Sequence, residues 1–454
     1  MFGPAANVDA ARLQALGSLV LAGAVAVAFA DSSIVVLALP QLLAELDTSI
    51  VGVSWVITAY NAVVAAATLG LGRRLARASP RVLSVAGLLV FLAASVGCAL
   101  CTSLGALVAV RCLQGAGAAL LLTGTLPLLA ATAGSQQRGT AVWVAAGVVG
   151  AAIGPALGGA LTEAFDWRAI FLVQAPVAAL ALPVALTARA RAAPRRGTSS
   201  PTRIALSANV ALALVFAALA GALFLVVVLL VDVWGMSPLG AATAVSALPI
   251  ATLVGGRLEG RPTGAATATG GVVALAAGLA GLALLPATSV PLVVWALALC
   301  GVGLGLALPF LTLRSLEGRS LTTAGAYSIG ARHAGLVLAL VLVAPLLARG
   351  VDSGAERAAL GATAAVLDAP VGVRDKIGLA LALDATIDDT PRGSMPDVEA
   401  AFVGREREGV GELQTTIVDT LESTLTRSFR PSFVLAALFA ALAAVPLLLL
   451  RRPG

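Results

Sequence analysis

Twelve long runs of apolar residues, separated mostly by short polar segments, dominate the pattern along the chain. They cover residues 17–39, 51–71, 82–101, 104–126, 139–161, 168–188, 204–230, 239–256, 265–287, 290–313, 322–348 and 429–450. Each run is long enough for a helix to cross about 30 Å of hydrocarbon at about 1.5 Å per residue. The pattern therefore predicts an all-α membrane protein with twelve transmembrane helices.

The distribution of arginine predicts how these helices are oriented. Alternate connections, together with the two chain ends, carry 17 arginines, against one, Arg168, in the opposite short loops. Because Lys and Arg are concentrated on the cytoplasmic side of membrane proteins, both termini are expected in the cytoplasm and the protein in the cytoplasmic membrane. The formal charge of +6 is thereby explained by topology, and no nucleic-acid partner is expected.

Internal similarity predicts two halves of six helices in the same orientation. The glycine pair Gly115 and Gly117 of span 4 recurs as Gly301 and Gly303 in span 10. Parallel repeats of this kind occur in secondary transporters, with the substrate site between the halves near the midplane. The expected divisions are an N-terminal bundle at 1–188, a cytoplasmic linker at 189–203, spans 7–11 at 204–348, an insertion at 349–428, and span 12 with a tail at 429–454.

The composition excludes most other classes of protein. Hydrophobic residues make up 59% of the chain and charged residues only 11%, unlike a soluble globular protein. With no Gly-rich loop ending in Gly-Lys-Ser/Thr, ATP-driven transport is not expected, and no triad or metal cluster indicates an enzyme or a cofactor. An ion gradient would then supply the energy, with passive facilitation as the alternative.

The few ionisable residues inside the spans are candidates for the functional site, because charges in the membrane interior are costly. Asp31 and Arg111 lie at similar depth in spans 1 and 4, roughly 10–12 Å from the outer end. They could form a pair if these spans face one cavity. Arg332 and His333, the only histidine, lie near the centre of span 11.

A carboxylate in this environment can change its affinity for protons. Burial disfavours its charged form and a nearby guanidinium favours it, so entry of water or substrate can switch between the two. Asp31 is therefore expected to bind protons or substrate, and Arg111 to take part in coupling. The alternatives are a structural polar group, a helix-packing ion partner for Arg111, carbonyl contacts for Arg332, and an interface hydrogen bond for His333.

Span 5 contains small residues at four-residue spacing, which let helices approach closely: Gly150, Gly154, Pro155, Gly158 and Gly159. The string from Gly154 to Gly159, GPALGG, resembles the antiporter motif of the major facilitator superfamily. Ordinary glycine-mediated packing is the alternative interpretation.

Further motifs extend this resemblance over most of residues 17–345. Residues 107–117, with Arg111, Gln114 and Gly115, resemble the superfamily's span-4 motif, whose arginine is implicated in proton coupling. Residues 31–40 resemble the acidic motif of its drug:proton antiporters, and the segment from Arg332 to Gly335 resembles a late motif of that branch, which usually has fourteen spans. The resemblance implies the major facilitator fold and proton-coupled antiport.

The cytoplasmic gating motif departs from the family pattern. Arg73 and Arg77 follow span 2, but Arg77 occupies the place where the family has Asp, and Pro80 the place of a Gly. The usual carboxylate latch is therefore absent from the first half. Glu259 could serve in the second half.

The segment at 349–428 is expected on the outer side, as a small helical cap over the exit. Residues 349–430 carry 14 acidic and 9 basic side chains, whereas the rest of the chain is basic. Apolar residues at helical spacing predict one helix at 410–425 and another at 373–387. A spacer, a lid, a lipid-facing surface and a dock for an extracytoplasmic partner are the alternatives.

Two functions agree with these features. The first is proton-coupled export of amphiphilic small molecules or drugs by a monomer in the lipid bilayer. The second is transport of envelope lipid or glycolipid, or partner binding, through the outer segment. Aromatic residues make up only 4% of the chain, which mildly disfavours a typical multidrug pocket.

Overall fold

The computed structural model describes residues 4–75, 77–188, 203–257, 264–286, 288–318, 320–369, 372–388, 402 and 410–450. Within these ranges all regular structure is helical, and twelve helical stretches are long and apolar enough to cross a membrane. Each contains most or all of one predicted span, so the all-α, twelve-span fold is confirmed. The predicted linker at 189–203, apart from its last residue, and Glu259 lie outside the described residues.

The first six spans form the N-terminal half. They are α1 (Pro4–Ile34) with η1 (Val35–Ala38) and α2 (Leu39–Glu45), α3 (Ile50–Leu75), α4 (Pro80–Ala99), α5 (Leu104–Thr132), α6 (Gln136–Ala164), and α7 (Ala169–Leu172) with α8 (Gln174–Thr187). The segments are helical because a helix pairs its own backbone N–H and C=O groups, which lipid cannot satisfy.

The C-terminal half repeats the arrangement. Its spans are α9 (Arg203–Val228) with η2 (Leu229–Val233), α10 (Pro238–Val245) with α11 (Ala247–Arg257), α12 (Ala265–Ala283), α13 (Val290–Ser315), α14 (Leu321–Asp368), and α18 (Arg430–Leu442) with α19 (Ala444–Leu449). Prolines lie close to several of the breaks within spans, at Pro40, Pro249 and Pro446. Proline lacks an N–H and clashes with the preceding turn, so the spans divide there.

The predicted glycine repeat has the same structural role in both halves. Each glycine lies where its helix meets a neighbour so closely that a side chain would collide: Gly115 with Tyr60 of α3, Gly117 with Phe91 of α4, Gly301 with Leu248 of α11, and Gly303 with Leu275 of α12. Span 4 thus packs on spans 2 and 3 as span 10 packs on spans 8 and 9.

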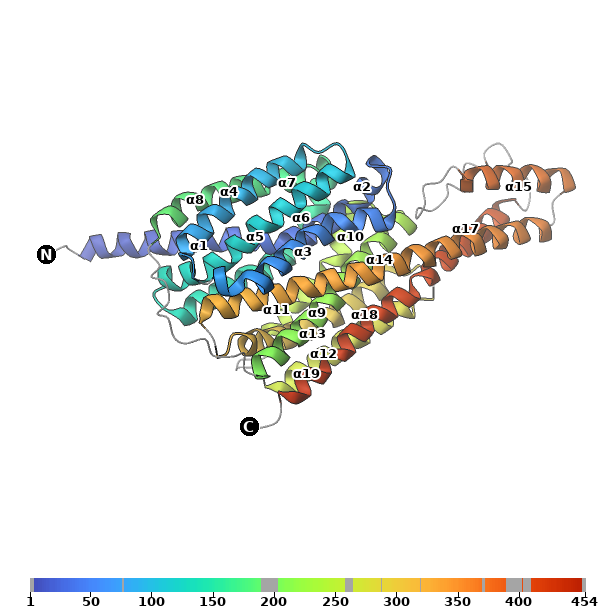
Figure 1. Ribbon diagram of the computed structural model, residues 1–454. Coiled ribbons are helices and arrows are strands. Elements are labelled where there is room, and N and C mark those ends of the chain that lie inside the picture. Colours follow the sequence, from blue (N-terminus) through green and yellow to red (C-terminus); the bar gives the residue numbers. More distant parts are fainter. Residues whose placement is uncertain are drawn as a thin grey trace.

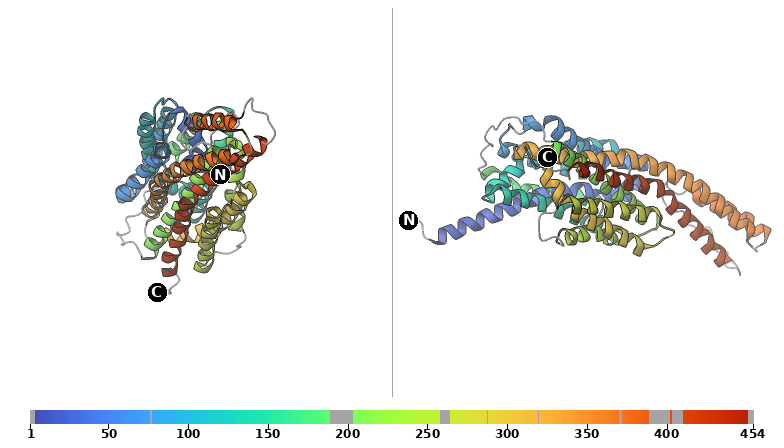
Figure 2. Two further views of the ribbon diagram at one scale, coloured as in Figure 1. Left: turned by 90° about the vertical axis from the view of Figure 1, so that its right-hand side faces the viewer. Right: turned by 90° about the horizontal axis from the view of Figure 1, so that it is seen from below.

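The two ends of the bundle differ (Figures 1 and 2). The start of α1 and the end of α19 lie at one end, called here the termini end. From the opposite end α14 and α17 (Val410–Ser428) project beyond the bundle, accompanied by α15 (Val373–Asp388). We call the described part of residues 355–423 the rod, and this end the rod end.

The rod has a small apolar core of its own. Its buried residues come from α14, α15, α17 and their connections: Ala358, Ala362, Val366, Ala369, Leu379, Phe402, Leu413, Ile417 and Leu421. Two of its helices, α15 and α17, confirm the helices predicted at 373–387 and 410–425.

The expected cap over the exit differs from the observed geometry. Helix α14 continues unbroken through the predicted boundary at residue 349, so the segment extends away from the bundle rather than across it (Figure 1). Gly350 and Gly354 lie within this helix, at the positions where α14 lies against Ser428 of α17.

Candidate functional site

Asp31 and Arg111 form an ion pair inside the N-terminal half. Arg111 Nη1 on α5 donates to Asp31 Oδ2 on α1 over 2.6 Å, and neither side chain is exposed. The two residues, which the sequence places at similar depth in spans 1 and 4, are thus in direct contact. Such a pair balances the charge that each residue would otherwise bring into the membrane interior.

Neutral amides lie around this ion pair and form further hydrogen bonds with it. Gln174 Nε2 on α8 donates to Asp31 Oδ1 over 3.0 Å. Gln114 accepts from Arg111 over 2.7 Å, and its amide nitrogen donates to Gln174 and to Ser95 on α4. The carboxylate is therefore held by one cation and one amide, and four spans contribute to its environment.

Close helix packing determines the position of the arginine. Gly115 lets α5 approach the backbone of α3 at Tyr60, and Arg111 lies one turn earlier on α5. Its Nε donates to the Val56 carbonyl over 2.8 Å, and its guanidinium carbon lies 4.4 Å from the centre of the Tyr60 ring. Its Nη2 is buried without a hydrogen-bond partner. The hydrogen-bonding capacity of the guanidinium is therefore not fully used.

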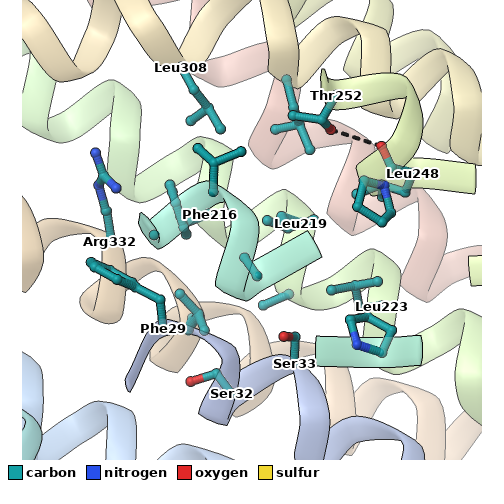
Figure 3. A pocket seen from close by; sticks show the side chains of 18 of the residues that line it. Phe29, Ser32, Ser33, Phe216, Leu219, Leu223, Leu248, Thr252, Leu308 and Arg332 are labelled. Carbon is teal, nitrogen blue, oxygen red and sulfur yellow. Dashed lines mark hydrogen bonds between the residues drawn. The ribbon is translucent and has the colours of Figure 1, made fainter. Parts of the chain in front are cut away.

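A cavity of about 370 Å³ lies between the two halves (Figure 3). Apolar side chains such as Phe29, Phe216, Leu219 and Leu308 form most of its wall. Asp31 does not line the cavity, but its neighbours Ser32 and Ser33 do. The carboxylate is therefore placed one residue away from the cavity wall.

The predicted pair in span 11 lines this cavity. Arg332 Nη2 donates to Thr312 Oγ1 on α13 over 2.7 Å, and its guanidinium lies 5.3 Å from the centre of the Phe216 ring. His333 Nδ1 lies 2.6 Å from Asn61 Oδ1 on α3. Asn61 also accepts from Ser32 over 3.0 Å, so a hydrogen-bonded chain leads from the residue after Asp31 to His333.

The glycines of the span-5 motif bring α6 into close contact with α1 of its own half and with α10 of the C-terminal half. A side chain at Gly150, Gly154 or Gly158 would collide with α1, and one at Gly159 would collide with Pro238 and Ala242 of α10. Pro155 lines the cavity. The motif therefore lies at the junction of the N-terminal half, the C-terminal half and the cavity.

The cavity is closed toward the rod end. There η1 of the N-terminal half and the ends of α9 and α10 share one apolar cluster, which includes Val35, Val227 and Val245. Glu163 on α6 accepts a hydrogen bond from the Leu239 backbone N–H of α10 over 2.8 Å. In the opposite direction the cavity reaches Arg257, in the last turn of α11, so its lining extends to the termini end.

The predicted gating residues of the first half lie away from this cavity. Arg73, in the last turn of α3, and Arg77 are exposed at the termini end. The preceding Gly72 lies against Ala326 of α14. At this point the two halves are thus in contact through the close approach of α3 and α14.

Comparisons with known proteins agree with the fold. The sequence profile described as Major Facilitator Superfamily matches residues 21–349. A crystal structure of a bacterial homolog to the human lysosomal transporter Spinster, in an inward-facing and unoccupied conformation, superposes with a TM-score of 0.64 at 15% identity, covering 97% of this chain and 99% of that chain.

Curated relatives are similar over shorter stretches. The methylenomycin A resistance protein of Bacillus subtilis is 34% identical over 167 residues, which are 36% of this chain and 36% of the relative. The drug efflux pump JefA of Mycobacterium tuberculosis is 35% identical over 158 residues, which are 34% of this chain and 30% of the relative. The matched part thus spans about a third of these relatives.

Proposed function

Because this chain belongs to the major facilitator superfamily, we propose that it is a proton-coupled exporter of amphiphilic small molecules that works by alternating access. The observation that carries the proposal is a mostly apolar cavity between the two halves, closed toward the rod end, with a buried carboxylate beside its wall. The named efflux and resistance functions of two relatives support export.

The cavity has the properties of a site for amphiphiles. Its volume of about 370 Å³ lies in the range of small-molecule sites, and its wall is largely apolar with a few polar groups. Alternating access requires the halves to separate at the rod end and meet at the termini end. The glycine contacts of α6 with α10 are the contacts that have to open.

Asp31 is the proposed proton carrier. Its charged form is stabilised by Arg111 and by the Gln174 amide, so a movement of α1, α5 or α8 that lengthens these contacts favours protonation. The hydrogen-bonded chain through Ser32 and Asn61 links this site to His333 on the other half. Rearrangement of the halves and loss of the proton would thereby be connected.

The arginine distribution supports an orientation with both termini in the cytoplasm. The cavity would then extend toward the cytoplasm, as an exporter needs for loading, and the rod would lie on the outer side. We propose the cytoplasmic membrane as the location.

The experiment is transport in proteoliposomes with an imposed proton gradient and a panel of amphiphiles. Substrate-induced dissipation of the gradient, read with a pH-sensitive dye, is expected for the wild type and is expected to be lost in Asp31→Asn. Asp166→Asn is the matched control, because Asp166 is a half-buried loop residue that does not line the cavity and pairs with Arg168 over 3.6 Å. Unchanged dissipation in Asp31→Asn would refute the proposed coupling.

The rod favours a second function, transport of envelope lipid or glycolipid or binding of an extracytoplasmic partner. Four large apolar side chains on it are more than half exposed: Leu360, Leu367, Ile377 and Leu381. Exposed apolar groups on a projecting element are typical of contact surfaces. Removal of the rod separates the two functions, because an exporter whose substrate site is the cavity should work without it.

A further inference from the structure

The charges that line the cavity all have one sign among the described residues. Arg332 and Arg257 are its two charged lining residues, and no carboxylate lines it. Asp31 does not compensate Arg332, because its own charge is already paired with Arg111. His333 holds Asn61 through Nδ1, and the other polar lining groups are hydroxyls.

Arg332 is buried with donors that remain unused. It is 6% exposed, and its Nε has no hydrogen-bond partner. Phe216 covers the face of the guanidinium, and Thr312 accepts from Nη2. A buried cation without a counter-ion is costly, and guanidinium donors bind carboxylate or phosphate oxygens in a fixed geometry.

The two sides of the cavity differ in chemistry. Figure 3 shows Arg332 at one side, next to Phe216 and Phe29, and Leu223 with Leu248 at the other. A ligand that fits both sides carries its charge at one end and an apolar body at the other. Arg257, in the last turn of α11, adds a positive charge where the cavity reaches the termini end, which attracts anions electrostatically.

We infer that this cavity binds amphiphiles with an anionic head group, held by Arg332 and Thr312, with the apolar body against the leucine-lined side. The inference rests on the proposed function, since it takes this cavity as the substrate site. A quaternary ammonium compound is disfavoured there, because it would meet Arg332 without a carboxylate in the described lining.

Equilibrium binding of three matched probes tests the inference. The probes are 4-(1-pyrenyl)butyrate, its neutral amide and its trimethylammonium counterpart, measured with the full-length protein in zwitterionic nanodiscs and corrected with empty discs. The carboxylate is expected to bind at least about tenfold more tightly than the ammonium probe, as a charge-assisted hydrogen bond would give. Equal binding, or tighter binding of the ammonium probe, would overturn the inference.

Variants of Arg332 test whether this residue causes the preference for the carboxylate probe. In Arg332→Gln the affinity for the carboxylate should fall by about tenfold, while that for the amide stays unchanged. Arg332→Lys should retain part of the preference, since it keeps the charge but loses the planar donor edge. The matched control is Arg168→Gln, which removes a half-buried loop arginine that does not line the cavity. A preference that persists in folded Arg332→Gln would contradict the assignment.

The assay separates this inference from the proposed function. Binding is measured without a proton gradient, so a failure of proton coupling leaves the charge preference intact. A preference for the cation refutes the inference even if the protein exports substrate against protons. If Arg332→Gln does not fold, Thr312→Val serves as the second variant, since it replaces the hydroxyl by a methyl group. It is expected to weaken binding of the carboxylate probe and to leave binding of the amide probe unchanged.

Discussion

His333 Nδ1 on α14 and Asn61 Oδ1 on α3 lie 2.6 Å apart, and this contact joins the two halves of the transporter. The Asn61 amide nitrogen donates to the Ile57 carbonyl over 2.8 Å, which leaves its oxygen to face Ser32 and His333. His333 therefore donates from Nδ1. All three side chains are buried, so each depends on this contact for part of its hydrogen bonding.

Asn61→Ala is expected to destabilise the folded protein by about 1–3 kcal/mol, because it leaves Ser32 and His333 buried without this partner. A double-mutant cycle with His333→Ala should show clearly non-additive losses. Reversible unfolding of the purified protein in mixed micelles measures them. Asn209→Ala is the control, since within the described residues the Asn209 side chain donates to the Ala205 carbonyl of its own helix and does not join the halves. Additive losses in the cycle would argue against a bond between the halves.

The Asp31–Arg111 pair leads to a second prediction about stability. Asp31→Asn leaves the Arg111 cation buried without a counter-ion, and removal of one partner of a buried pair costs about 3–5 kcal/mol. The double variant Asp31→Asn/Arg111→Met removes the unpaired charge as well and should be more stable than Asp31→Asn alone. Both values come from the same unfolding assay, and a double variant less stable than the single would contradict the electrostatic interpretation.

Much of the fold could be predicted because its signals are strong in a single sequence. Apolar runs long enough to cross a membrane are rare in soluble proteins, and a glycine pair repeated in two spans marks equivalent helix contacts. Asp31 and Arg111 could be singled out because charges within spans are rare, and their similar depth suggested that they could pair.

The partners of these charges could not be predicted. Gln174, Asn61 and Thr312 are neutral residues of ordinary polarity within spans, and only the packing of distant helices places them beside Asp31, His333 and Arg332. The helices of the rod could be predicted, but its projection away from the bundle could not. The apolar run ends at residue 348, whereas α14 continues to Asp368, and Gly350 and Gly354 approach α17, which is far along the chain.

Gly159→Leu is expected to open the rod end. A Cβ at Gly159 would lie 2.6 Å from the Pro238 carbonyl oxygen, so a leucine forces α6 away from α10 where the halves meet. A cysteine at Val36, which lines the cavity near this contact, reports the change. In a background without the four native cysteines, a membrane-impermeant thiol reagent applied from the rod side should label it several times faster than without the leucine.

Gly270→Leu is the control for this wedge. Gly270 also lies within a transmembrane helix, but a Cβ there meets no other group within 4 Å. It should leave the labelling rate unchanged. Equal labelling in the Gly159→Leu protein, if it remains folded, would show that the α6–α10 contact does not keep the rod end closed.

Removal of the rod is expected to separate the two proposed functions. Residues 356–423 can be replaced by a short Gly-Ser linker, because a Cβ at Gly354 would lie 3.7 Å from Leu425, so α14 and α17 are already adjacent there. The rod core ends at Leu421, whereas Leu425 belongs to the core of the bundle. The shortened protein should therefore fold, and an exporter whose substrate site is the cavity should keep its transport in proteoliposomes.

Ile417→Asp is a second variant, since it disrupts the packing of a fully buried rod residue without shortening the chain. If both variants abolish transport while the bundle remains folded, the rod takes part in handling the substrate, and the lipid or partner-binding function accounts better for the molecule.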